Sequence, residues 1–157
     1  MTRSEIHTVI EQHLNAEAAH DAAAAATYRA DAYYEHVPLG VRVTGRDAVR
    51  AQYAASFAAV PDSVAVYEGE VIDGDRFVHW GRLQGTVRGS WLGQPATGRT
   101  IDLPFVAIIE VRDGSMVGET VHYDLATLCD QAGFSLEAVR AAAKGLREAI
   151  AGKPRAA

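Results

Sequence analysis

The chain has 157 residues, of which 48% are apolar, and it carries a formal charge of −5 with an isoelectric point near 5.6. This length and composition favour one folded domain over a disordered chain. The acidic balance argues against nucleic-acid binding, which needs a basic surface. No stretch approaches the roughly 18 consecutive apolar residues of a membrane span.

The residues at the start of the chain show no apolar signal-peptide core behind a basic segment. Cys129 is the single cysteine, so it cannot form an internal disulfide, which fits a reducing compartment. We therefore expect a soluble, cytoplasmic protein that binds neither nucleic acid nor membrane.

The first part of the chain is predicted to be mainly helical. Apolar residues at helical spacing predict an amphipathic helix over about 4–20. A second short helix is predicted over about 21–29, because Asp21 is a good N-cap and alanine is the best helix former. A strand over 31–37 and an amphipathic helix over about 44–60 follow.

After residue 62 the apolar period changes from about 3.6 to 2, which indicates a sheet. Turn sequences, of which Asp113-Gly114 is a strong hairpin signal, divide this part into four strands. The predicted strands are 64–72, 76–88, 100–111 and 116–123. A helix is expected from Asp124 and a last amphipathic helix over about 135–151, followed by a loose tail.

Helices segregated from a run of sequential strands indicate an α+β fold with a curved antiparallel sheet. The N-terminal helices are expected to lie across the concave face and to enclose a pocket for a hydrophobic small molecule. No linker or internal repeat divides the chain. We therefore predict a single domain over 1–157, with a core over about 4–133 and a C-terminal helix over about 135–151.

One loop carries a specific resemblance to a known family. Residues 85–99 read Gly-Thr-Val-Arg-Gly-Ser-Trp-Leu-Gly-Gln-Pro-Ala-Thr-Gly-Arg. This resembles the Gly-Thr-His-x-Gly-x-Phe-x-Gly-x-Pro-Pro-Thr-Gly-Arg signature of the SnoaL-like polyketide cyclases. Four other segments are similar to that family, namely 35–40, 45–49, 60–62 and 122–133. The resemblance spans about 31–133.

The resemblance implies the cone-shaped α+β barrel of the nuclear-transport-factor-like superfamily, which also holds ketosteroid isomerases, scytalone dehydratase and limonene epoxide hydrolase. Three departures from the family pattern bear on the reaction. Val87 stands where many members carry histidine, Trp80 stands where many carry arginine, and Glu119-Thr120 replaces a common His-Trp pair.

Asp124 is the main candidate catalytic residue. An aspartate between a strand and Leu125 is typical of a helix N-cap, and the residues alone favour that interpretation. The resemblance instead implies a general acid/base, whose pKa an apolar pocket would move toward neutral. His122, two residues earlier, would share the face of Asp124 as a second proton carrier or oxyanion donor, or else as a hydrogen-bonded core or interface histidine.

The pocket wall is predicted from strand alternation. A two-residue loop at Asp113-Gly114 would place Phe105 opposite His122, with Ile109 on the same face, whereas a one-residue slip would bring Glu110 onto it. His79 alternates with Trp80, so one of them faces the pocket, and the pattern does not decide which. The predicted substrate-binding residues are Tyr34, His36, Tyr53, Phe57, His79, Trp80, Phe105 and Ile109.

The leading functional hypothesis is a cofactor-free enzyme of the polyketide cyclase type. It would act on a hydrophobic polyketide or polycyclic carbonyl compound by proton abstraction and intramolecular aldol-type ring closure, with Asp124 and His122 as its catalytic residues. The alternatives are an isomerase, a dehydratase or an epoxide hydrolase in the same fold, or a non-catalytic binding or dimerisation module. Epoxide opening would require Arg82 or Arg88 to point inward.

No metal site is predicted. His7, His13 and His20 stand six and seven residues apart, which is not the i, i+4 spacing of a helical zinc pair.

Apolar residues on the outer face of the sheet predict a homodimer or higher homo-oligomer. The candidates for that surface are Trp80, Trp91 and Val106.

Overall fold

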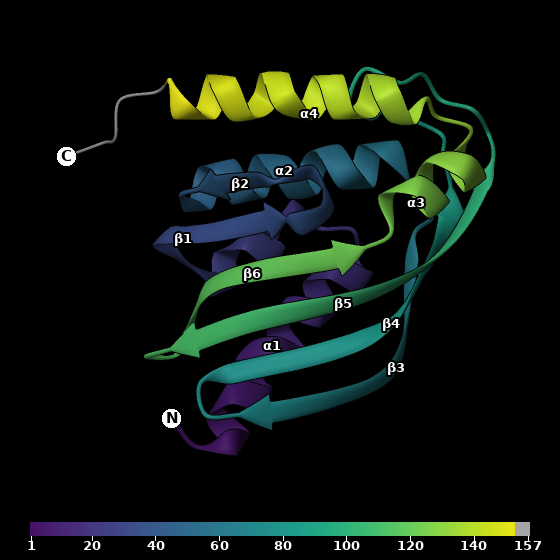
Figure 1. The fold of residues 1–157 in the computed structure, drawn as a ribbon. Coiled ribbons are helices and arrows are strands. Elements are labelled where there is room, and N and C mark those ends of the chain that lie inside the picture. The colour runs from purple at the N-terminus through teal and green to yellow at the C-terminus, as the bar shows by residue number, and fades with distance from the viewer. Residues whose placement is uncertain (153–157) are drawn as a thin grey trace.

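The computed structural model describes residues 1–152, so the part of the expected loose tail over 153–157 lies outside the described residues. Within these residues the chain begins with a helix, forms six strands with a helix between the second and the third, and ends with two helices (Figure 1). The helices are α1 (Arg3–Ala18), α2 (Arg46–Ala59), α3 (Leu125–Ala132) and α4 (Leu136–Ala151), with 3-10 turns η1 (Ala22–Thr27) and η2 (Val37–Leu39). The strands are β1 (Tyr28–His36), β2 (Val41–Thr44), β3 (Val64–Asp73), β4 (Arg76–Thr86), β5 (Thr100–Arg112) and β6 (Ser115–Tyr123).

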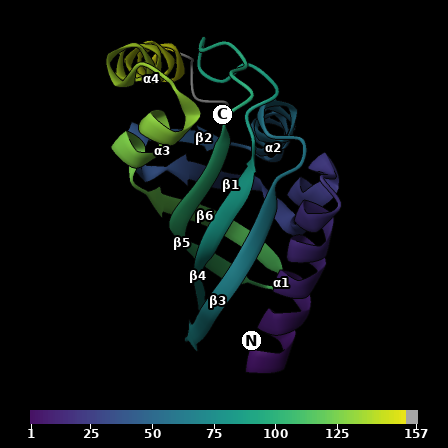
Figure 2. The same cartoon turned by 90° about the vertical axis from the view of Figure 1, so that its right-hand side faces the viewer.

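The strands form one sheet in the order β2-β1-β6-β5-β4-β3. Every neighbouring pair is antiparallel except β1 and β6, which run parallel. The sheet is strongly twisted, and α1 and α2 lie on one side of it (Figure 2). This confirms the predicted α+β class with a curved sheet. No helix within residues 1–152 is long and apolar enough to cross a membrane.

The segment after α1 differs from the sequence-based expectation. The helix expected over 21–29 is a single 3-10 stretch, and Tyr28 already belongs to β1. Alanine propensity is overridden by tertiary contacts, because Ala24 and Ala25 are fully buried and Tyr28 places its hydroxyl in the core. The short edge strand β2 was not predicted. It pairs with β1 after the left-handed turn at Gly40.

The β5–β6 hairpin decides which side chains of β6 face inward. Its turn is the expected two-residue Asp113-Gly114 turn, with positive φ at both residues. One extra residue, Val117, then forms a bulge between the pairs Val111–Met116 and Glu110–Gly118. The bulge reverses the alternation of the rest of β6, because side chains alternate faces with a period of two.

The apolar core consists of two clusters. The first packs α1, η1 and α2 on the inner face of β4, β5 and β6, around Tyr28 and Phe77. The second joins the opposite ends of β4 and β5 to α3 and α4, around Val87 and Leu103. Residues of both clusters contribute to the wall of one cavity.

The close approach of β3 and β4 at Gly81 gives a test of the fold. A Cβ at Gly81 would lie 2.1 Å from the carbonyl oxygen of Val66, whereas a Cβ at Gly145 in α4 meets nothing within 4 Å. We expect Gly81→Ala to lower the free energy of unfolding by roughly 1–3 kcal/mol through overpacking. Gly145→Ala should raise it by up to about 1 kcal/mol through helix propensity. Urea denaturation measures both, and equal effects of the two substitutions would contradict this packing.

Candidate functional site

A cavity of about 290 Å³ lies between the concave face of the sheet and the helices. Its wall is mostly apolar, as is usual for small-molecule sites. The polar lining residues are Glu17, Tyr34, His36, Gln52, Tyr53, Ser56, Ser63, Tyr67, His79, Glu119 and Tyr123. No arginine or lysine within residues 1–152 lines this cavity.

The structure brings six of the eight predicted substrate-binding residues into this wall. They are Tyr34, His36, Tyr53, Phe57, His79 and Phe105. The other two lie elsewhere: Ile109 is fully buried in the first core cluster, and Trp80 is 39% exposed on the outer face of the sheet. The alternation along β4 thus places His79 inside and Trp80 outside. Trp91, which we expected on an outer surface, lines the cavity and stacks on Phe134.

The expected placement of Asp124 and His122 in the pocket is wrong. Asp124 is exposed, and its Oδ1 accepts a hydrogen bond of 2.5 Å from the backbone amide of Thr127, as a helix N-cap does. This hydrogen bond holds the pKa of the Asp124 carboxyl below its usual value. His122 is exposed opposite Val106, because the bulge at Val117 turns it to the outer face.

Glu119 takes the inward position instead, opposite Ile109. Its Oε2 accepts hydrogen bonds from the hydroxyls of Tyr28, at 2.5 Å, and Tyr53, at 2.9 Å. Burial by itself would raise the pKa of the Glu119 carboxyl, but His13 and Tyr28 outweigh burial and lower that pKa. Glu119 is therefore a buried carboxylate whose charge is held by its neighbours.

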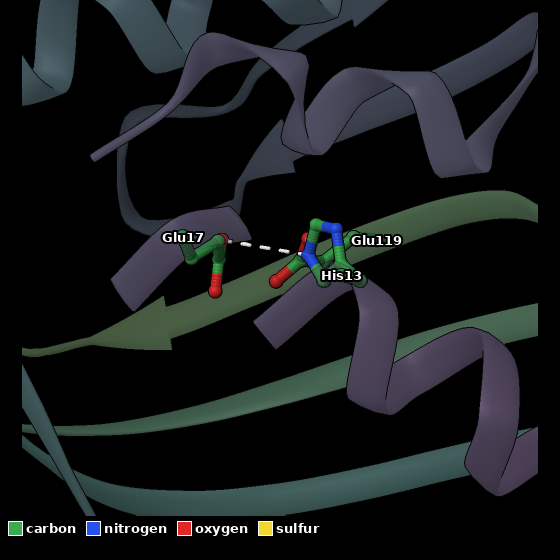
Figure 3. A group of neighbouring side chains, drawn as sticks. All are labelled: His13, Glu17 and Glu119. Carbon is green, nitrogen blue, oxygen red and sulfur yellow. Dashed lines mark ion pairs between the residues drawn. The ribbon is translucent and has the colours of Figure 1, made fainter. Parts of the chain in front are cut away.

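His13 and Glu17 project from α1 toward Glu119 on β6 (Figure 3). His13 Nε2 lies 3.4 Å from Glu17 Oε1 and 3.7 Å from Glu119 Oε2. Burial would lower the pKa of His13, yet the two carboxylates raise it to about 10. The ring is therefore an imidazolium at neutral pH. Two carboxylates and one imidazolium leave this group with a net charge of about −1.

The same three residues have the composition of a metal site, since their ligand atoms lie within 4.8 Å of one another. His13 Nδ1 donates to the carbonyl oxygen of Ala24 at 3.3 Å, while Nε2 is 3.2 Å from the hydroxyl of Tyr53. Both ring nitrogens thus have protein partners, and Glu119 is already engaged by two tyrosines. We interpret the group as a charge-coupled hydrogen-bond network.

His36 forms a second polar group in the wall. Gln52 Nε2 donates to His36 Nε2 at 3.0 Å, so the ring proton is on Nδ1, which lies 3.3 Å from the Tyr123 hydroxyl. Burial lowers the pKa of His36 to about 4. The ring is therefore neutral at physiological pH, and the hydroxyl of Tyr123 keeps its own proton available to a ligand.

Residues 7–132 match the sequence model of the SnoaL-like polyketide cyclases. The chain belongs to this family. Comparison with curated proteins finds no match. The match covers all six strands and α3, so both the loop of residues 85–99 and the inward-facing residues of β6 lie within it.

Solved structures show the same fold. A candidate SnoaL-like polyketide cyclase from Jannaschia sp. CCS1 superposes with a TM-score of 0.75 at 21% identity, over 82% of this chain and 92% of that chain. TsrD from Streptomyces laurentii gives 0.72 at 22% identity, over 85% and 98%. IdmH, a candidate polyketide cyclase from Streptomyces antibioticus, gives 0.67 at 22% identity, over 82% and 98%.

Sequence reasoning missed several polar residues of the cavity wall in this SnoaL-like chain, among them Glu17, Glu119 and Tyr123. Glu17 stands four residues after His13, a spacing that places two side chains on one helix face. The spacing of the histidines among themselves does not reveal this pair. For Glu119, the signal was Gly118, because a glycine inside a strand often marks a bulge.

His36 gives a pH-dependent prediction for stability. Its pKa is about 4 in the folded protein against 6.5 as the ordinary value, so the unfolded chain binds a proton here first. This residue's contribution is complete above pH 6.5 and is lost as the pH falls toward 4. Glutamine is neutral throughout this pH range. We therefore expect the free energy of unfolding of His36→Gln to fall by on the order of 2 kcal/mol less than that of the wild type as the pH is lowered toward 4. Urea unfolding at a series of pH values measures the difference, and identical pH profiles would contradict it.

Proposed function

We propose that this protein is an acid–base enzyme that binds a hydrophobic carbonyl compound in the cavity and closes a ring by an intramolecular aldol-type step. The observation that carries the proposal is a carboxylate, Glu17, in the wall of a largely apolar cavity. Family membership supports the reaction class. In this proposal Glu17 has the proton-carrying role that the family resemblance implied for Asp124.

Glu17 is favoured over Glu119 by access. The Glu17 side chain is 24% exposed and lines the cavity, whereas Glu119 is almost completely buried. Two tyrosine hydroxyls already donate to Glu119, which weakens it as a base. Glu119 serves instead as the lasting counterion of His13, so Glu17 can gain a proton without leaving the imidazolium unpaired.

The reaction then proceeds in three steps. Glu17 takes a proton from the carbon next to a ligand carbonyl, which leaves an enolate. The enolate carbon attacks a second carbonyl of the same molecule, so that a carbon–carbon bond forms and the second oxygen becomes an alkoxide. Glu17 returns its proton to the alkoxide, which restores the carboxylate. The Tyr123 hydroxyl is a suitable donor to the enolate oxygen, because His36 donates to its oxygen and leaves its proton free.

Epoxide opening is less well supported, since it requires an arginine beside the reacting group. Arg82 pairs with Asp102 at 2.7 Å, and Arg88 lies 3.5 Å from Asp62. Neither arginine lines the cavity. A wall that offers hydrogen-bond donors and the Glu17 carboxylate, and to which no arginine of residues 1–152 contributes, suits enolisation better than epoxide hydrolysis.

A model ketone tests the proposal without knowledge of the natural substrate. 2-Tetralone is a bicyclic ketone whose carbon-bound protons next to the carbonyl exchange with D2O, and NMR follows that exchange. We expect the wild-type protein to accelerate the exchange, and Glu17→Gln to reduce the acceleration by about 10²-fold or more, because general bases contribute about 10²–10⁴-fold. Added EDTA should leave the wild-type rate unchanged.

Asp124→Asn is the matched control, since it is the same change of carboxylate to amide outside the cavity. Asparagine caps helices about as well as aspartate, so this variant should keep both its stability and its exchange activity. Loss of activity in Asp124→Asn with retention in Glu17→Gln would overturn the assignment. Activity that disappears with EDTA and returns with Zn²⁺ would make His13, Glu17 and Glu119 a metal site instead.

A homodimer and a cytoplasmic location stay predictions from the sequence. The homodimer gains support from Trp80 and Val106, which are both 39% exposed and are paired neighbours on β4 and β5. Their shared position on the outer face leaves the cavity on the opposite side of the sheet.

A further inference from the structure

We propose that His79 is a hydrogen-bonding subsite for an oxygen atom of an aromatic ligand, such as a phenol hydroxyl or a ring ketone. The inference names the ligand class for the cavity of the proposed function, but it does not depend on Glu17 as the proton carrier. It rests on the burial of His79, on the lack of partners for its ring nitrogens among residues 1–152, and on the aromatic residues around it.

His79 is 4% exposed, and neither ring nitrogen has a hydrogen-bond partner within residues 1–152. A buried polar group without a partner destabilises the folded state, and such groups are rare in folded proteins. His79 nevertheless lines the cavity. A ligand atom that hydrogen-bonds to the imidazole would remove this destabilisation. The cavity should therefore bind a ligand more tightly when the ligand has an oxygen atom beside the ring nitrogens of His79.

The surroundings of His79 define the rest of the ligand. Tyr67 stacks on the ring at 5.1 Å and 27°, Phe105 meets it edge-on at 5.7 Å, and Phe77 lies 5.3 Å away. These side chains offer apolar faces and no hydrogen bond to the imidazole. A flat aromatic ligand that carries an oxygen matches both the faces and the unpaired nitrogens.

Tyr67 provides the route by which a ligand reaches the ring nitrogens. It lines the cavity, yet it is 42% exposed, and it lies on the edge strand β3 where the pairing with β4 shifts between Tyr67 and Gly69. Because Tyr67 is partly exposed, its ring can rotate off the imidazole toward solvent, with the loss of its contacts with His79 and Phe105. The ligand's aromatic ring would then replace that of Tyr67 beside His79.

The imidazole can serve both oxygen types. Burial lowers the pKa of His79, which keeps the ring neutral at physiological pH. A neutral imidazole has one N–H donor and one acceptor nitrogen. It can therefore donate to a ketone or accept from a phenol. A ligand with a carboxylate would instead be repelled by the negative charges of Glu17 and Glu119, which line the same cavity.

Binding of 2-naphthol and naphthalene, followed by fluorescence titration, tests the proposal because the two probes differ in one hydroxyl. We expect His79→Phe to weaken 2-naphthol binding by about tenfold, the effect of losing one buried hydrogen bond, and to leave naphthalene binding unchanged or tighter. Trp80→Phe, at the neighbouring position on the outer face, should change neither affinity.

Thermal unfolding of the free His79→Phe protein is the second measurement. We expect the melting temperature to stay the same or to rise, since the substitution removes a buried polar group and breaks no hydrogen bond. Equal losses for both probes, no binding of 2-naphthol by the wild type, or a marked fall in melting temperature would each overturn the proposal. A failed exchange test with Glu17→Gln, alongside an intact preference for 2-naphthol, would reject the proposed reaction and keep the subsite.

Discussion

The single inserted residue at Val117 is the constraint on which the site depends. Without that bulge, the two-residue turn at Asp113-Gly114 would continue an unbroken register and direct His122 inward. With it, Glu119, Val121 and Tyr123 line the cavity. The chemical character of the wall follows from this change, because the inward side of β6 carries a carboxylate and a phenol rather than an imidazole.

The inward-facing side chain of Glu119 also determines how the helices pack on the sheet. A buried carboxylate is stable only when charged or polar groups compensate for its lost hydration. Here Tyr28 donates from β1, Tyr53 from α2, and His13 supplies a positive charge from α1. One side chain of β6 thereby links α1 and α2 to the concave face of the sheet and also bonds to the neighbouring strand β1. Glu17 remains the carboxylate at the edge of this network that a ligand can reach.

Much of the architecture was predictable from local rules. The Asp113-Gly114 turn, the strand alternation and the helix caps are encoded within a few residues, and a family signature agreed with them. The alanine run was misjudged because propensity is weak against the packing of Tyr28. Asp124 was misplaced because a one-residue bulge has no strong sequence signal beyond Gly118, yet it inverts every later position of the strand. The surroundings of His79 join β3, β4 and β5, and no local pattern contains them.

The central claim is that the carboxylate beside a bound carbonyl compound is Glu17, inside the cavity, while Asp124 caps a helix outside it. A crystal structure of the protein with 2-tetralone tests this most directly. We expect a carbon next to the ketone to lie about 3–3.5 Å from a Glu17 oxygen, the separation of a reactive pair. Asp124 should keep its hydrogen bond to the amide of Thr127. A ketone bound beside an inward-turned Asp124, with Glu17 directed to solvent, would contradict the claim.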